Sequence, residues 1–451
     1  MKKIKKILAL LMAMAFVLST VACAAADGYM GAGPGGGYYG ESFVGGLEDD
    51  AVEPSDPSEG GEADGGETEG EEDKKEEEVI VRLPSGMITA GAWNDNDNYS
   101  MWLSLFSQGN EEEEIADGKF YSYVLSNKLW DFNSLKRVKV SVTNEGTPVS
   151  GATVVAFDNQ DNALFTAVSD AQGNAYLFVT EDEGKVTIAS GEGTASAEFT
   201  AESRELSVEL SARDEKLNVV EIMFVVDVTG SMGDEINFLK AELADVINKI
   251  AAADSETVIK LALLFYRDLN DKVPFYYCDF IDVTDPVGLE LRISELEKQF
   301  ASGGGDYEEA VDEALEMAVE KQWSTGNTTK LIFHVLDAPA HSGKKYETRF
   351  NAAVLAAAQK GIRICPILCS GAAELTEYTM RQAAIYTGGT FIFVTDDSGI
   401  GGSHHDPNLP NVTVELLNSM LVRLVKGYHT GEFEEPIYWR DDPALATQDN
   451  Q

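Results

Sequence analysis

The residues with the clearest capacity for chemistry follow an apolar segment in the second half of the chain. Asp227, Thr229 and Ser231 stand at alternate positions in Asp227-Val-Thr-Gly-Ser231, directly after the apolar run 222–226. Alternate side chains of an extended or turning segment project to the same side, so one carboxylate and two hydroxyls can converge. Oxygen donors without histidine or cysteine suit a hard cation. The pentad therefore predicts a site for Mg²⁺, with Mn²⁺ or Ca²⁺ as alternatives.

Two later segments add acidic residues at the ends of expected elements. Ser302-Gly-Gly-Gly-Asp306 opens a predicted helix, and the apolar run 331–336 ends in Asp337. Together with the pentad, these loops resemble the metal-ion-dependent adhesion site of von Willebrand factor A domains, with Thr229 in place of the first serine. The resemblance implies that Asp306 fills the second-loop position, directly or through water, and that Asp337 fills the third.

The resemblance implies a binding function. Mg²⁺ takes six oxygens and keeps waters, so such a site leaves a position for an Asp or Glu of a partner, an extracellular protein or cell-wall component. We expect no enzymatic activity. Two alternatives stay open: a metal-dependent hydrolase with Asp306 as base, or a scaffold subunit of a surface complex. Catalysis is less favoured because the sequence has no Gly-x-Ser-x-Gly around Ser231, no phosphate-binding loop and no second metal cluster.

The elements that must position these residues alternate between apolar runs and amphipathic segments from residue 218 onward. This rhythm predicts an α/β domain over 216–430 with a doubly wound, mostly parallel, Rossmann-like sheet. Ligands bind such sheets at the carboxyl ends of their strands, where Asp227 lies. We expect strands at 222–226, 259–265, 276–283, 331–336, 362–368 and 390–394, and helices near 287–300, 307–321, 346–360, 374–386 and 413–426.

Several other polar residues near these elements are expected to have structural roles. Phe265-Tyr-Arg267-Asp268 resembles a signature of bacterial von Willebrand A domains, and Arg267 and Asp268 are expected to pair and orient the rim. His334 lies within a predicted strand and is expected in the core. The histidines on predicted loops, to which we assign no metal, are His341, His404 and His405.

The region before the α/β domain divides into two parts. Short alternating runs separated by Gly, Asn and Asp predict a β-sandwich over 137–215. Its segment Gly146-Thr-Pro-Val-Ser-Gly resembles immunoglobulin-like sandwiches of the carboxypeptidase-regulatory-like or transthyretin-like kind, which implies a structural spacer. The aromatic, turn-rich region 81–136 is expected to fold, but its type stays open.

The N-terminal segment predicts export from a bacterial cell. Residues 1–23 run from lysines through an apolar stretch to small residues, and Thr20-Val-Ala-Cys23 resembles a lipobox. Lipidation of Cys23 would anchor the protein to the outer face of the cell membrane, whereas ordinary cleavage among Ala22 to Ala26 would release it. The Gly-rich, acidic segment 24–80 is expected to be a disordered tether, and 431–451 a C-terminal tail.

Charge and cysteine content narrow the range of partners. The formal net charge of −43 makes nucleic acid a poor electrostatic partner and favours cations and basic surfaces. Besides Cys23 the sequence has only Cys278, Cys365 and Cys369, which imply no disulfide framework and no zinc motif.

Overall fold

The computed structural model describes residues 85–443 and 445, apart from 111, 113–115, 127–131 and 254–255. All of them belong to one compact unit, Glu78–Gln451. The predicted signal peptide, Cys23 and the tether lie outside the described residues. No helix in the described part is long and apolar enough to cross a lipid bilayer.

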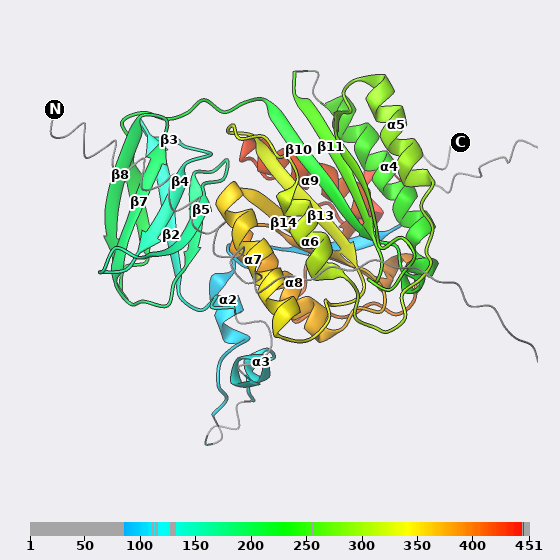
Figure 1. Cartoon of the computed structure of the whole chain (residues 1–451), viewed down its shortest axis with the longest axis horizontal. Helices are drawn as coiled ribbons and strands as arrows, with labels where there is room; N and C mark the ends of the chain where they lie inside the picture. Colours follow the sequence, from blue (N-terminus) through cyan, green and yellow to red (C-terminus); the bar gives the residue numbers. More distant parts are fainter. Residues whose placement is uncertain are drawn as a thin grey trace, which may run out of the picture. The chain divides into compact units, whose positions relative to one another are not determined.

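A mixed eight-stranded sheet forms the centre of the α/β domain (Figure 1). Five strands, β11, β10, β13, β14 and β15, run parallel. The outer strands β12, β1 and β16 each pair antiparallel with a neighbour. The predicted α/β sheet is therefore confirmed, with an antiparallel strand pair added at one edge. In sheet order the strands are β12 (Phe275–Asp282), β11 (Val258–Tyr266), β10 (Val219–Asp227), β13 (Thr329–Leu336), β14 (Ile362–Leu368), β15 (Phe391–Val394), β1 (Thr89–Trp93) and β16 (Glu415–Leu416).

Helices cover both faces of this sheet because its central strands are apolar on both sides. Alternate residues of β10 enter two different cores: Phe224 packs with residues of α4 and α9, whereas Val225 packs with residues of α6, α7 and α8. Left-handed glycines end three of these helices, at Gly361, Gly388 and Gly431. The six helices are α4 (Ile236–Ala253), α5 (Pro286–Glu297), α6 (Val311–Glu320), α7 (Lys344–Lys360), α8 (Glu374–Thr387) and α9 (Leu417–Thr430).

Strand β1 completes the sheet although it lies far from the rest of the domain in sequence. It sits between β15 and β16, with Trp93 opposite Phe391 and Thr89 opposite Leu416. The predicted boundary at residue 216 excludes this strand, which the sequence pattern placed in the separate region 81–136. The α/β domain therefore needs residues that precede both smaller sheets.

The side chain of Glu242 on α4 fixes the approach to β1. Its two carboxylate oxygens accept hydrogen bonds from the backbone N–H groups of Gly86, Met87 and Ile88, at 2.9, 2.6 and 3.0 Å. Glu242 is fully buried, and burial raises the pKa of its carboxyl group against the lowering effect of these three donors.

Replacing Glu242 by alanine is expected to lower the free energy of unfolding by about 2–3 kcal/mol, because three backbone donors lose a charged acceptor. Urea unfolding measures this loss. The exposed helix residue Glu290 provides the matched control, Glu290→Ala, which should change little. Equal midpoints for the two variants would show that Glu242 does not hold this segment.

Two four-stranded sheets precede strand β10 in the chain (Figure 1). Their inward residues, such as Val140 and Val154, belong to one hydrophobic cluster. This cluster also reaches α8, where the ring of Phe178 stacks on that of Tyr386 with centroids 4.6 Å apart. The relation of this region to a named sandwich family stays a prediction. One sheet holds β3 (Thr147–Pro148), β2 (Arg137–Asn144), β6 (Asn174–Phe178) and β9 (Glu205–Glu209); the other holds β5 (Ala163–Val168), β4 (Thr153–Phe157), β7 (Gly184–Ser190) and β8 (Gly193–Phe199).

A buried ion network joins the segment after β1 to helix α8. Arg381 is fully buried and donates from Nε and Nη2 to Asp95 at 2.9 and 2.5 Å, and from Nη1 to Glu377 at 2.8 Å. The other carboxylate oxygen of Glu377 bonds His405 Nε2 at 2.7 Å. The guanidinium also lies over the ring of Trp102, 5.2 Å from its centroid. The Asn/Asp-rich turn after β1 therefore has a structural role.

Candidate metal centre

The first loop of the site follows the end of β10. Asp227 Oδ1 accepts hydrogen bonds from the backbone N–H and the hydroxyl of Thr229, at 2.9 and 2.7 Å. The hydroxyl oxygens of Thr229 and Ser231 lie 3.1 Å apart. Asp227 and Thr229 are fully buried. The structure thus brings together the three oxygen-bearing side chains of the pentad, at the carboxyl end of a central parallel strand.

Two further carboxylates approach the first loop. Asp337 follows β13, the parallel neighbour of β10, and Glu309 precedes α6. Burial and then the charge of Asp337 raise the pKa of Asp227 to about 7. Burial and then the charges of Asp227, Asp268 and Asp337 raise the pKa of Glu309 to about 9. These groups form one buried cluster of carboxyl groups that resists ionisation in the absence of a cation.

Two buried carboxylate oxygens of this cluster lack a hydrogen-bond partner in the described part of the chain, which indicates that a cation belongs here. The buried atoms Asp227 Oδ2 and Glu309 Oε2 have no hydrogen-bond partner among the described residues. Buried polar atoms in native proteins almost always have a partner, and buried carboxylates need a cation or a proton. All candidate donors here are oxygens, so the residues fit a hard divalent cation such as Mg²⁺.

Glycines let the second loop, residues 302–306, lie against the first loop, residues 227–231. Gly303 and Gly304 adopt φ values of 79° and 77°, which only glycine adopts without strain. A Cβ atom on Gly304 would stand 2.7 Å from Glu309 Oε1. The backbone N–H of Gly230 bonds the carbonyl of Gly303 at 3.1 Å, which joins the two loops directly. Gly303 and Gly304 are therefore required by the backbone conformation and close packing at the site.

The sequence pattern does not single out Glu309, because it predicts a helix from residue 307. The helix begins only at Val311, and the backbone N–H of Glu309 bonds the carbonyl of Pro339 at 3.1 Å. This bond ties the second loop to the third and turns Glu309 inward, to an exposure of 3%. The available signal was the three-residue spacing of Glu309 from Asp306 within a loop rich in glycine.

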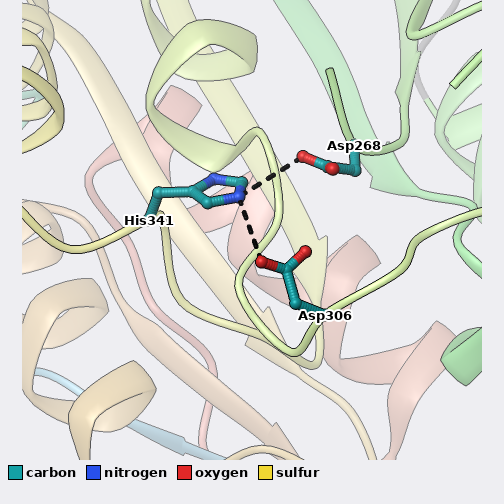
Figure 2. Close-up of side chains that lie close together, drawn as sticks. All are labelled: Asp268, Asp306 and His341. Atoms are coloured by element: carbon teal, nitrogen blue, oxygen red, sulfur yellow. Dashed lines mark ion pairs between the residues drawn. The ribbon is translucent and has the colours of Figure 1, made fainter. Parts of the chain in front are cut away.

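The structure places Asp306 in a different set of contacts. Its side chain is 61% exposed, and its Oδ2 lies 3.9 Å from His341 Nε2. The same nitrogen lies 3.5 Å from Asp268 Oδ1 (Figure 2). Arg267, expected to pair with Asp268, instead donates to the backbone carbonyls of Ser302 and Phe300 at 2.8 and 3.0 Å, which supports the second loop.

The other histidines have structural partners. His334 is fully buried in β13, its Nε2 lies 3.2 Å from the hydroxyl of Tyr266, and burial lowers its pKa to about 3. It is therefore a neutral core residue, as expected. His404 bonds Glu235 and Asp396, each at 2.7 Å. These contacts hold the loop that follows β15 against the start of α4.

A doubly wound α/β sheet with acidic and hydroxyl side chains at the carboxyl ends of β10 and β13 defines the class of domain. Residues 221–396 match the family model of the von Willebrand factor A domain. The alpha-protein kinase vwkA of Dictyostelium discoideum is 27% identical over 130 residues, which cover 29% of this chain and 20% of that protein. The chain thus spans about a fifth of the length of that relative.

Several solved structures are also similar. A von Willebrand factor type A protein from Catenulispora acidiphila is 12% identical, with 62% of this chain and 51% of that chain covered and a TM-score of 0.32. The pilus adhesin SpaC from Lactobacillus rhamnosus GG, in its open conformation, is 11% identical, with 61% and 35% covered and a TM-score of 0.33. BatB from Bacteroides thetaiotaomicron is 16% identical, with 39% and 89% covered and a TM-score of 0.29.

Proposed function

We propose that this protein is a cell-surface module that binds a partner protein through a divalent cation. The cation, Mg²⁺ or else Mn²⁺ or Ca²⁺, is held by Asp227, Thr229, Ser231 and Asp337, with Glu309 as a further carboxylate. The observation that carries this proposal is the pair of buried carboxylate oxygens without hydrogen-bond partners, on Asp227 and Glu309. Asp306 stands at the exposed rim, where it acts through water if it contacts the ion.

An open coordination position gives the binding mechanism. Mg²⁺ retains waters when protein ligands do not fill its six positions, and a carboxylate of a partner can replace one. Such a contact is made only when both the ion and an acidic side chain are present. The proposed partner is an extracellular protein or cell-wall component that presents Asp or Glu at its surface.

A groove beside the second loop supports a partner of this chemistry. Its volume is about 390 Å³, and it shares Ser302 and Asp271 with the surroundings of that loop. Arg267, Lys272 and Lys298 line it together with Asp271 and Glu295, and Lys298 pairs with Glu295 at 2.9 Å. Phe300 at its edge is 64% exposed. With three cationic and two acidic side chains and an exposed Phe300, the groove suits a partner segment that has both an acidic and an apolar side chain.

The same proposal includes the position of the module on the cell. Lipidation at Cys23 would hold the protein at the outer face of the bacterial membrane, and the acidic segment 24–80 would serve as a tether. The sheets over 137–215 would act as a spacer of the sandwich type. The strongly negative chain would be repelled from nucleic acid and from anionic lipid surfaces.

Calorimetric titration of the purified full-length protein with Mg²⁺ tests the proposal. We expect one saturable site in the wild type, and loss of this site in Asp227→Asn, which keeps the size of the side chain. Asp441→Asn, at an exposed position, is the matched control and should bind as the wild type does. Unchanged Mg²⁺ affinity in folded Asp227→Asn protein would overturn the proposal.

The open position can be tested with Mn²⁺ as a spectroscopic substitute and acetate as the simplest carboxylate. Water exchanging on bound Mn²⁺ accelerates the proton relaxation of the solvent. Acetate should reduce this acceleration in a saturable way by taking the water's place. No change at saturating acetate would show that the ion has no position for a partner.

A further inference from the structure

We propose that Asp268, Asp306 and His341 form a second metal site, distinct from the Mg²⁺ site and selective for Zn²⁺. The three residues come from three separate segments: Asp268 follows β11, Asp306 belongs to the second loop, and His341 follows β13. Each offers one ligand atom, and these atoms all lie within 4.8 Å of one another. Figure 2 shows the imidazole directed between the two carboxylates.

The distances fit ligands around a common ion better than an ordinary ion pair. His341 Nε2 lies 3.5 Å from Asp268 Oδ1 and 3.9 Å from Asp306 Oδ2. A charge-assisted hydrogen bond would bring these atoms to about 2.7–2.9 Å. Ligands held at about 2.0–2.2 Å from a tetrahedral ion stand roughly 3.4 Å apart. A small inward movement of Asp306, which is exposed and on a glycine-rich loop, would complete this arrangement.

Burial of Asp268 supplies an independent observation. This residue is only 3% exposed, and its Oδ1 has no hydrogen-bond partner in the described part of the chain. Its Oδ2 accepts a hydrogen bond from Asn270 Nδ2 at 3.2 Å, which fixes the orientation of the carboxylate. The unsatisfied oxygen is the one that faces His341. A buried carboxylate oxygen without a donor is the arrangement that a bound cation satisfies.

The type of donor identifies the ion. Imidazole nitrogen suits Zn²⁺ and related transition ions, whereas the neighbouring site presents only oxygens and suits Mg²⁺. Three protein ligands with a fourth position open is a common form for zinc. The two sites interact electrostatically, because the charge of Asp268 raises the pKa of Glu309. His341, to which the sequence pattern assigns a loop position without a metal, is therefore the residue that distinguishes the two sites.

The experiment uses the full-length protein in excess Mg²⁺, titrated with Zn²⁺ by calorimetry and with Co²⁺ by visible absorption. We expect one Zn²⁺ per chain and a Co²⁺ spectrum typical of nitrogen and oxygen ligands. His341→Ala should abolish both signals, and Asp306→Asn should weaken Zn²⁺ binding by more than the roughly 10–100-fold cost of an outer-shell change. Thermal unfolding verifies that the variants fold.

Asp227→Asn separates this inference from the proposed function. It should lose Mg²⁺ binding and keep the Zn²⁺ and Co²⁺ signals. If His341→Ala binds Zn²⁺ as tightly as the wild type, or if Zn²⁺ binding is lost in Asp227→Asn instead, the ion occupies the first site and the second site is disproved. Absence of Zn²⁺ binding by the wild type also disproves it. The Zn²⁺ results for the wild type and for His341→Ala do not depend on whether Mg²⁺ binding requires Asp227.

Discussion

Replacing Arg381 by methionine is expected to lower the free energy of unfolding by about 3–5 kcal/mol, which is the usual cost of breaking a buried ion network. Methionine preserves much of the volume but leaves Asp95 and Glu377 as buried carboxylates without their cation. Both are almost completely buried, so water cannot replace the lost hydrogen bonds. The contacts between the guanidinium and the rings of Trp102 and Phe120 are lost as well.

Urea unfolding of the full-length protein measures the effect of Arg381→Met. Arg440→Met is the control, because Arg440 is exposed. A triple variant that adds Asp95→Asn and Glu377→Gln should recover part of the stability, since it removes the uncompensated charges. If Arg381→Met unfolds at the same urea concentration as the control, the network does not tie β1 to α8.

The metal-free protein should lose stability as the pH rises from about 4 to 9. The folded-state pKa of Asp227 is raised to about 7 and that of Glu309 to about 9. Between the unfolded and folded pKa values, the folded state keeps protons that the unfolded chain has released. The stabilising contribution is therefore complete below about pH 4, and is lost as the pH rises through 7 and then 9. Each such proton changes stability by about 1.4 kcal/mol per pH unit.

Glu309→Gln isolates this effect from other titrating groups. The pKa values of His404 and His405 are also raised by their carboxylate partners, and both groups lose stabilising charge as the pH rises. The difference between wild type and Glu309→Gln in the presence of a chelator, followed by thermal unfolding at several pH values, cancels these contributions. We expect the difference between the two proteins to begin near pH 4.5 and to grow until about pH 9, with the variant less sensitive to pH.

Mg²⁺ binding should show the converse dependence, with the apparent affinity of the wild type rising with pH because the ion displaces protons. Calorimetry in two buffers of different ionisation enthalpy measures the number of protons released. This number should be smaller in Glu309→Gln. An affinity that does not change with pH would show that Glu309 and Asp227 are already ionised without metal.

The first loop could be predicted from the sequence because its arrangement depends only on residues that are neighbours in the chain. A buried strand followed by three oxygen-bearing residues at alternate positions is sufficient to place Asp227, Thr229 and Ser231 on one side. Glu309 could not be predicted in the same way. Its inward position depends on a backbone bond to Pro339, so the residue is set by a contact between two loops.

Two other features depend on contacts between segments far apart in sequence. The approach of His341 to Asp268 requires that the carboxyl ends of β11 and β13, which flank β10, lie at one rim of the sheet. Strand β1 is five residues long and has no hydrophobic pattern that distinguishes it from an independent segment. Its place is determined by open hydrogen-bonding edges of β15 and β16, which no local pattern reveals.

The position of β1 has a consequence for how the protein is made. This strand leaves the ribosome before both smaller sheets, but its neighbours β15 and β16 are among the last elements to be synthesised. Until they emerge, β1 has exposed N–H and C=O groups, and its contacts are of very high sequence separation. Strand β1 stays unpaired while the intervening chain is synthesised and folds. Its addition to the sheet is therefore expected to be a late and slow step. A cell that produces this protein would need to protect the segment that contains β1 from aggregation during that interval.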